Sequence, residues 1–483
     1  MTKHNTLTKL LISLCTPLLL NTTSIAAECN HNASECMTLS NLVNHLKAFQ
    51  QFADNNSELP GTRFVSTSGY DETRDYIAKK MRDAGYQVSL QDVPMDITYV
   101  TSPRIVEQVT PDVKTYQDNI DYAPIVNSGG ADITAALQLP AGDGCNASDY
   151  SAFKSGNITL IQIGDHCDRN VAIQNAIEAG AKGIIVSYRG LGVRYMGWNP
   201  ASPTISENIP ILASSNEMAN ELKQAIASGI TPKLHIQFKA VRKTIPSHNI
   251  IAESQGGDPN HVVMVGAHID SSHGNAGMND NASSAATVLE TALLMKNITP
   301  MKKLRFAWWT GEELGLIGSN YYVEHLSQAE KSKIAVYLNF EVLGAPNGGR
   351  MIMGTSDGVT PKGSEKITQL YVDYFKSKNL KYYVFDPALA NAARRSDMFA
   401  FMNAGIPVGF IITGAELPWN PLFDSIFTDL PKRVNGLDTH PCYHKACDKL
   451  TMSGDEIHDA NFDFDLYLQM SKAAAHAVYT SAM

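Results

Sequence analysis

Apolar and polar positions recur with two different periods along this chain, and the two periods predict its helices and strands. From residue 71 to residue 84 the apolar side chains Ile77, Met81 and Ala84 fall on one side of a helix. Residues 86–93 alternate between apolar and polar positions, as a strand with one buried face does. The first part of the chain is therefore predicted to be a helix followed by a strand.

The character of the sequence changes between residues 97 and 243, where Gly, Pro, Asn and Ser become frequent. Short apolar runs at 158–163 and 183–187 predict strands, and 171–179 and 217–227 predict helices. We expect this stretch to form a small α/β unit of its own.

After residue 246 strands and helices alternate regularly. The predicted strands are 261–267, 303–309, 334–342, 350–353 and 407–413, and the predicted helices are 283–297, 314–326, 367–378 and 461–480. Apolar strands that alternate with helices indicate a mostly parallel central sheet sandwiched by helices. The fold class is therefore α/β.

The N-terminus carries the pattern of an export signal. Lys3 and Lys9 precede an apolar run from Leu10 to Leu20, and small residues up to Ala27 follow it. The run is too short to cross a bilayer. We expect residues 1–27 to be removed and the mature chain to be secreted, to the periplasm or the medium.

Cysteine usage agrees with export. Seven cysteines are present, and cleavage of the signal would remove Cys15. An even number in an exported chain indicates disulfides, although the count alone leaves many pairings open. Short spacings favour the pairs Cys29–Cys36, Cys145–Cys167 and Cys442–Cys447.

Composition excludes several classes of protein. Hydrophobic residues make up 44% and charged residues 18% of 483 residues, which is typical of a globular protein with two or three domains. Acidic residues outnumber basic ones by 48 to 39, so the net charge is −9. Binding to nucleic acid as the main role is excluded, because phosphate contacts need a basic surface.

Polar residues gather where the predicted strands end. They are His268, Asp270, Asp280, Glu312, Glu313, Glu341 and His444. The carboxyl ends of parallel strands meet at one edge of a sheet, so these side chains are candidates for one site. Histidine together with carboxylates suits divalent ions, above all zinc. A further Glu beside a ligand is what metal-assisted hydrolysis needs as a base.

Several stretches taken together resemble a known family. They are Val265–Ser271, Gly277–Ser283, Leu304–Ser319, Tyr337–Glu341, Arg395–Asp397, Gly405–Gly409 and Cys442–His444 with Cys447. Over about residues 40–93 and 246–483 the chain is similar to the two-zinc exopeptidases of the bacterial secreted leucyl aminopeptidase type. That family also includes glutaminyl cyclases and the transferrin-receptor ectodomain. The resemblance implies the zinc exopeptidase fold.

The middle segment resembles a protease-associated domain. The likeness is carried by Gly144–Tyr150, Gly156–Ile158, Cys167 and Ala176–Gly183. It implies the following layout: signal 1–27, catalytic domain 28–96 and 244–483, and protease-associated insert 97–243.

The resemblance also implies a metal-ligand set. His268 and Glu313 would hold separate zinc ions, Asp280 would bridge them, and His444 would complete one site. Glu341 stands where the family normally has Asp. Its extra methylene must be absorbed by the backbone or by the way in which the carboxylate binds the metal.

Further roles follow from the same resemblance. Glu312 would take the proton from the water that two zinc ions activate, and Tyr443 would stabilise the oxyanion. Asp270 would orient a histidine ligand. Arg395 would lie near the substrate, and Ile412 would line the side-chain pocket.

We therefore predict a secreted aminopeptidase with two zinc ions per chain that releases N-terminal residues, leucine or other apolar ones, from peptides. We expect a monomer with neither a nucleic-acid partner nor stable membrane insertion. The alternatives are a one-zinc acyltransferase like glutaminyl cyclase, a serine hydrolase using the Gly354–Gly358 turn, and a binding protein without catalysis.

Overall fold

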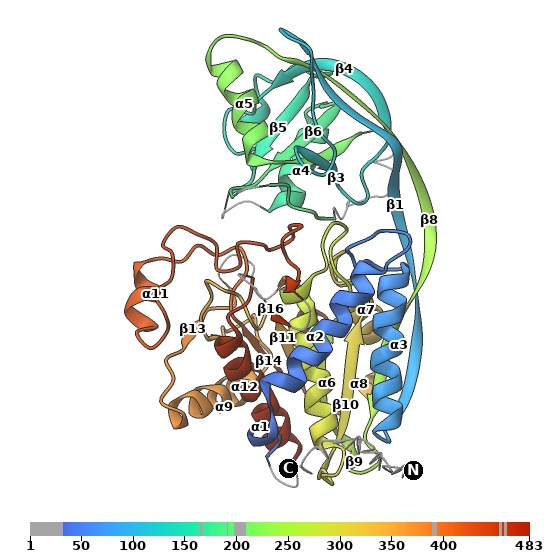
Figure 1. The fold of residues 1–483 in the computed structure, drawn as a ribbon, viewed down its shortest axis with the longest axis vertical. Helices are drawn as coiled ribbons and strands as arrows, with labels where there is room; N and C mark the ends of the chain where they lie inside the picture. The colour runs from blue at the N-terminus through green and yellow to red at the C-terminus, as the bar shows by residue number, and fades with distance from the viewer. Residues whose placement is uncertain are drawn as a thin grey trace, which may run out of the picture.

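The structure is a computed structural model that describes residues 32–164, 168–190, 192–197, 209–388, 394–453, 456–457 and 461–483. The predicted signal 1–27, Cys29 and Cys167 lie outside the described residues. The chain forms two bodies, joined along one side by a long ribbon of strands β1 (Gln87–Thr110) and β8 (Lys233–Glu253) (Figure 1).

The remaining elements follow the chain in this order. The helices are α1 (Ala33–Cys36), α2 (Leu39–Asp54), α3 (Ser68–Asp83), α4 (Arg169–Glu178), α5 (Asn216–Ala227), α6 (Ser284–Met295), α7 (Ile317–Glu324), α8 (Gln328–Lys331), α9 (Ser364–Ser377), α10 (Met398–Asn403), α11 (Pro421–Ile426) and α12 (Phe464–Ala482). The strands are β2 (Lys114–Thr115), β3 (Tyr122–Pro124), β4 (Ala131–Gln138), β5 (Ile158–Gln162), β6 (Gly183–Ser187), β7 (Ile211–Ser214), β9 (Asp258–His268), β10 (Lys302–Trp309), β11 (Ile334–Glu341), β12 (Met351–Met353), β13 (Tyr383–Phe385), β14 (Val408–Ile412), β15 (Met452–Ser453) and β16 (Glu456–Ile457).

The larger body is built on a mostly parallel sheet. Strands β14, β11, β9 and β10 are parallel neighbours in that order. Antiparallel β8 adds to β10 on one side, and antiparallel β12 adds to β14 on the other. All four parallel strands end at the same edge of the sheet, which is the edge where functional sites of such sheets form.

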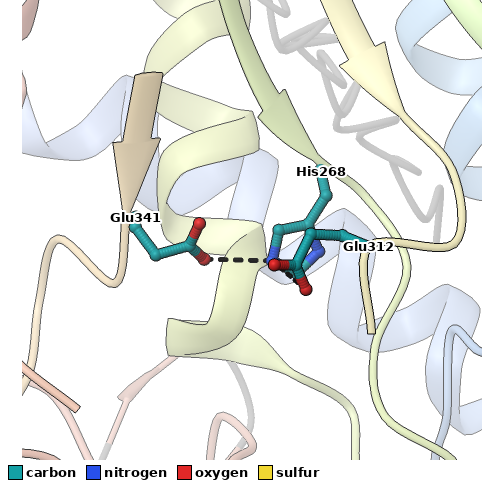
Figure 2. A group of neighbouring side chains, drawn as sticks. All are labelled: His268, Glu312 and Glu341. Carbon is teal, nitrogen blue, oxygen red and sulfur yellow. Dashed lines mark hydrogen bonds and ion pairs between the residues drawn. The ribbon is translucent and has the colours of Figure 1, made fainter. Parts of the chain in front are cut away.

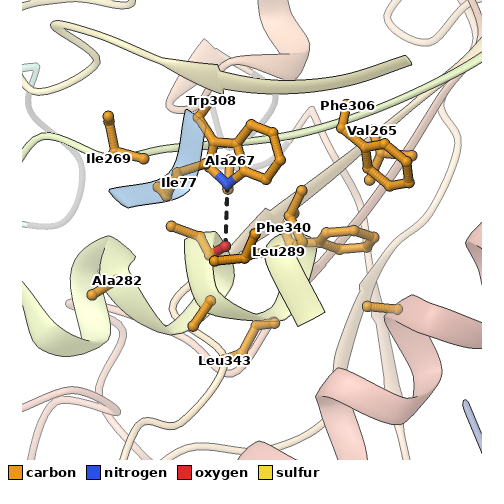
Figure 3. Packing of buried hydrophobic residues seen from close by; sticks show 14 of the residues in the cluster. Ile77, Val265, Ala267, Ile269, Ala282, Leu289, Phe306, Trp308, Phe340 and Leu343 are labelled. Atoms are coloured by element: carbon orange, nitrogen blue, oxygen red, sulfur yellow. Dashed lines mark hydrogen bonds between the residues drawn. The ribbon is translucent and has the colours of Figure 1, made fainter. Parts of the chain in front are cut away.

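Helices cover both faces of this sheet, as β9 shows residue by residue. Val263, Val265 and Ala267 belong to one apolar cluster, which α2, α3, α6 and α12 complete. Val262 and Met264 belong to a second cluster on the opposite face, with α7 and α10. Side chains alternate across a strand, so a strand that is apolar at every position is buried on both faces. Figure 3 shows the first cluster in close view.

The strands of the smaller body continue the sheet through β8, which pairs with β4 in antiparallel orientation, and they have their own core. Strands β4, β5, β6 and β7 are parallel, and β3 adds to β7 in antiparallel orientation. Two apolar clusters lie in this body. The domain boundaries predicted at 97 and 243 stay predictions, and both positions fall inside the ribbon strands.

Most elements match the expected positions within a few residues, with two instructive differences. The strand expected at 86–93 continues to Thr110, because β8 pairs with it along nearly its whole length, with two irregularities. In the middle of the ribbon, residues 239–244 are mostly exposed, so the alternating pattern that would signal a strand fades there. The helix expected from 314 begins only at Ile317, because Leu316 has a left-handed φ of 60°.

Within the part of the chain that the structure describes, each helix is either too short or too polar for a bilayer crossing.

Candidate metal centre

Metal-ligating side chains converge at the carboxyl edge of the parallel sheet. His268 is the last residue of β9 and Glu341 the last of β11. Glu312 and Glu313 lie in the turn that follows β10. Asp280 lies in η3 (Met278–Ser283), a short irregular helical turn directly before α6. The sheet thus gathers side chains that are far apart in the sequence, as the strand-end pattern predicts.

Two groups of candidate ligands result. In each group the ligand atoms lie within 4.8 Å of one another: the first group is His268, Glu312 and Glu341, and the second is Asp280, Glu313 and His444. Figure 2 shows the first group, in which His268 Nε2 lies 3.0 Å from Glu341 Oε1 and 3.8 Å from Glu312 Oε2.

Asp280 joins the two groups. Its Oδ1 lies 3.3 Å from His268 Nε2, and its Oδ2 lies 3.0 Å from His444 Nε2. In the second group His444 Nε2 also lies 2.9 Å from Glu313 Oε2. One carboxylate therefore faces a histidine of each group, which is the position that a bridging ligand between two metal ions would take.

The donor set fits divalent metal ions. The site brings one imidazole and several carboxylates together in each group, which are the ligands that zinc accepts. Glu313 Oε1 is buried, and no hydrogen-bond donor of the described residues reaches it. A buried carboxylate oxygen without a donor is costly unless a cation satisfies it.

The concentration of negative charge points the same way. Burial raises the pKa of Glu312 well above its ordinary value, and the neighbouring Glu341 and Asp397 raise it further. Burial also raises the pKa of Glu313, to about 7. Burial alone would lower the pKa of His444, but Glu313 and Asp280 outweigh it and raise the pKa to about 9. Carboxylates this close together call for cations between them.

Asp270 is fully buried next to His268 of the first group. Its carboxylate accepts hydrogen bonds from the backbone N–H groups of Glu312 and Glu313, each at 3.2 Å. Its Oδ1 also lies 3.5 Å from His268 Nδ1. Asp270 is thus in contact with a histidine of the site, as expected, and it additionally holds the glutamate turn.

The side chain of Glu341, one methylene longer than that of Asp, contacts two partners. One oxygen faces His268, and the other accepts a hydrogen bond of 2.5 Å from Ser396 Oγ. Ser396 in turn accepts a hydrogen bond of 2.8 Å from Asn339. Ser396 belongs to a stretch that carried the family likeness, but nothing in the sequence assigned it to the carboxylate.

His444 sits on a short loop closed by the expected disulfide Cys442–Cys447. The Tyr443 ring stacks on the His444 ring at 4.0 Å between centroids. Cys36 and Cys145 are also disulfide-bonded. Their predicted partners lie outside the described residues, so those two pairings stay predictions.

The two expected substrate residues, Arg395 and Ile412, are both partly accessible to solvent. Arg395 is half-exposed and forms an ion pair of 2.5 Å with Glu416. Ile412 ends β14 and is half-buried against two apolar clusters. The Gly354–Gly358 turn leads into α9 only at Ser364, so it lacks the immediate strand-to-helix step of a serine hydrolase.

Sequence reasoning missed Arg63, a fully buried cation that contacts the loops beside the site. Its guanidinium donates to the carbonyls of Ile269, Ala276 and Gly277, which flank the segments that carry Asp270 and Asp280. A lone arginine beside the apolar Phe64–Val65 pair was the one available signal.

Two family models match the chain. The model described as "Peptidase family M28" matches residues 249–464, and the model described as "PA domain" matches residues 131–222. The second match lies within the smaller body.

Curated relatives match most of the chain. An aminopeptidase of Pseudomonas aeruginosa strain PAO1 is 34% identical over an alignment that covers 86% of this chain and 77% of the relative. Aminopeptidase Y of Saccharomyces cerevisiae is 30% identical, with 87% and 74% covered.

Solved structures show the same fold. The zinc aminopeptidase BSAP from Bacillus subtilis superposes with a TM-score of 0.65 at 23% identity, covering 90% of this chain and 94% of that one. An aminopeptidase from Aneurinibacillus sp. strain AM-1 gives a TM-score of 0.65 at 22% identity, covering 94% and 96%.

Proposed function

The chain belongs to peptidase family M28 and is a zinc-dependent aminopeptidase with an inserted PA domain, and on this premise we propose that two zinc ions bind per chain at the carboxyl edge of the sheet. The observation that carries the proposal is Asp280, whose two oxygens face a histidine of each ligand group at 3.3 and 3.0 Å.

The ligands divide between the two ions. His268 and Glu341 would hold one ion, Glu313 and His444 would hold the other, and Asp280 would serve both. When bound, the ions supply Lewis-acid chemistry that polarises the scissile carbonyl and makes water a nucleophile near neutral pH.

Glu312 acts as the general base. Its side chain is 12% exposed, so it faces the site while most of it is shielded from bulk water. Glu312 takes a proton from the attacking water and returns it to the leaving amine. Asp270 fixes the backbone of Glu312, so the carboxylate stays aimed at the same point.

Tyr443, Ile412 and Arg395 act on the substrate. The Tyr443 hydroxyl donates to the oxyanion that forms at the scissile carbonyl. Ile412, at the end of β14, contributes apolar surface for the first side chain of the peptide, and Arg395, paired with Glu416, contacts the substrate. A preference for leucine or other apolar residues is supported by relatives named leucine aminopeptidase 2, one from Aspergillus fumigatus at 32% identity.

The disulfide also bears on where the protein is located. The disulfide Cys442–Cys447 supports an oxidising compartment, and therefore export of the chain to the periplasm or the medium. We expect a monomer that acts on peptides.

A one-zinc enzyme would need only one group of metal ligands. The two linked ligand groups therefore favour the aminopeptidase over a glutaminyl cyclase.

The test combines metal analysis with a substrate panel. The purified chain should contain two zinc ions, should release p-nitroaniline from leucyl-p-nitroanilide faster than from the lysyl and glutamyl analogues, and should leave a glutaminyl peptide uncyclised. Glu312→Gln should keep the zinc and lose about 10²–10⁴-fold in kcat. One zinc ion per active chain would contradict the two-metal site, and full activity of the variant would contradict the role of Glu312.

A further inference from the structure

One segment of the PA domain reaches the metal centre. The backbone N–H of Tyr195 donates a hydrogen bond of 2.7 Å to the carbonyl of His444. The Tyr195 ring lies against Gly274, where an added Cβ would come within 2.2 Å of the ring. At Gly197 an added Cβ would lie 3.3 Å from the backbone oxygen of Glu313. Residues 193–197 therefore pack on three loops that carry or adjoin ligands of the site.

Arg194 is the charged residue of that segment, and its side chain is 5% exposed. Its Nη1 lies 2.8 Å from Glu416 Oε2, and its Nη2 lies 3.4 Å from Asp438 Oδ2. The guanidinium also lies over the Tyr188 ring at 4.7 Å and over the Tyr443 ring at 5.8 Å. A buried arginine of one body is thus paired with two carboxylates and one aromatic ring of the other.

The ion pair of Arg194 with Glu416 extends to Arg395, the proposed substrate residue. Glu416 shares its carboxylate between Arg194 and Arg395, with Arg395 Nη2 at 2.5 Å from Oε1. Truncating Arg194 would leave the partly buried Glu416 carboxylate with one cation fewer and would remove the guanidinium that lies over Tyr443.

The loop that Arg194 supports needs outside support. His444 has a φ of 54°, a left-handed conformation that is unfavourable for a residue with a side chain. Tyr443 stacks on His444, so a shift of either residue moves both. The Tyr195 hydrogen bond and the Arg194 guanidinium hold this pair from the PA-domain side.

We propose that Arg194 is a positioning residue for the aminopeptidase reaction, through which the PA domain holds Tyr443 and, by way of Glu416, Arg395 in place for the substrate. The proposal rests on the proposed function, since it assigns Tyr443 to the oxyanion. It gives the PA domain a part in the chemistry without any contact of Arg194 with the reacting atoms.

The expected effect is on turnover. A displacement of about 1 Å in a group that acts in the transition state can cost about 100-fold in rate. Arg194→Gln should therefore lower kcat for leucyl-p-nitroanilide about 10- to 100-fold, change KM by a smaller factor, and keep the wild-type zinc content. Arg194→Lys retains the charge but lacks the two-pronged guanidinium that reaches both carboxylates. Its kcat should therefore lie between those of the wild type and Arg194→Gln.

Arg350→Gln is the matched control. Arg350 is equally buried and pairs with Asp429 at 3.0 Å, and its other partners, Gln469 and Lys381, are not ligands or substrate residues. It should lose stability on a scale similar to Arg194→Gln while keeping the wild-type kcat. Glu416→Gln breaks the same ion pair from the catalytic side, and in the double variant with Arg194→Gln the losses in kcat should not multiply.

Two results for Arg194→Gln would contradict its role as a positioning residue. If Arg194→Gln lowers the melting temperature but turns over like the wild type, the contact is structural and the proposal is wrong. If it loses zinc in proportion to activity, the effect acts on metal binding and the proposal also fails. Absence of zinc-dependent activity in the wild type would instead count against the proposed function, because all of these comparisons are made relative to the wild type.

Discussion

The carboxylate of Asp270 accepts a hydrogen bond of 3.2 Å from the backbone N–H of Glu312, so a buried side chain from the end of one strand holds the proposed base from the end of another. The same oxygen, Oδ1, lies 3.5 Å from His268 Nδ1, and the other oxygen accepts from the Glu313 N–H at 3.2 Å. The base and two candidate ligands therefore depend on one carboxylate.

Replacing Asp270 by Asn tests that dependence. The amide keeps the shape of the side chain but offers one oxygen to two N–H donors, so either Glu312 or Glu313 loses its acceptor. We expect kcat or zinc affinity to fall about 10- to 100-fold. Kinetics with leucyl-p-nitroanilide and zinc retention on dialysis against a chelator would measure it. Asp96→Asn, a change at an exposed carboxylate, should leave both unchanged, and wild-type values for Asp270→Asn would contradict the role.

Arg63 should matter for stability and for metal binding at once. Arg63→Met would remove the Arg63 donor from the buried carbonyls of Ile269 and Ala276, at about 1–3 kcal/mol each, whereas the Gly277 carbonyl would keep its hydrogen bond from the Ala282 N–H. We expect a large fall in the free energy of unfolding together with loss of zinc at lower chelator concentration. Arg350→Met should destabilise the fold while leaving zinc retention unchanged. Equal zinc retention in the two variants would show that Arg63 does not organise the site.

Glu341→Asp would install the residue that the family normally has at this position. The shorter side chain cannot face His268 at 3.0 Å and also accept from Ser396 at 2.5 Å without backbone movement. We expect the variant to lose zinc, and with it activity, at a lower chelator concentration than the wild type. Ser396→Ala removes the same hydrogen bond and should shift the chelator midpoint in the same direction. Two unshifted midpoints would mean that this hydrogen bond does not tune the metal site.

The disulfide Cys442–Cys447 should contribute to stability and activity in different proportions. It closes a very short loop, since the two cysteines are five positions apart in the sequence, so restricting the unfolded chain contributes only about 2 kcal/mol. The double variant Cys442→Ser/Cys447→Ser should therefore stay folded at room temperature but turn over more slowly, because His444 and Tyr443 lie between the two cysteines. Unfolding curves and kcat measured on the same preparation separate the two effects. An unchanged kcat would assign the disulfide to stability alone.

Glu416 should make stability depend on pH in the acid range. Burial would raise its pKa, but Arg395 and Arg194 outweigh burial and lower the pKa from 4.5 to about 2. The unfolded chain then binds the proton at a higher pH than the folded chain does. The stabilisation is present above pH 4.5 and is lost as pH falls toward 2. Urea unfolding at about pH 5 and about pH 3 measures the free energy of unfolding at each pH. That free energy should fall less between the two pH values for Glu416→Gln than for the wild type. Equal losses would argue against the depressed pKa.

The sequence by itself determined the sheet and the position of the site. Apolar runs such as the one ending at His268 specify strands buried on both faces, and parallel strands bring their polar end residues together wherever the loops lead. The loop between Cys442 and Cys447 was also readable, because its two cysteines are close in the chain.

Only the tertiary structure decided which residues support that site. Arg63 and Ile269 are 206 positions apart, and Arg194 and Glu416 are 222 apart. No periodicity or spacing links such pairs, because local patterns report which face of an element is buried and say nothing of what it is buried against. The ribbon of β1 and β8 shows the same limit: it is exposed in its middle, so its length follows from strand pairing. The place of the PA domain beside the metal centre follows from that pairing together with tertiary contacts such as the hydrogen bond from Tyr195 to His444.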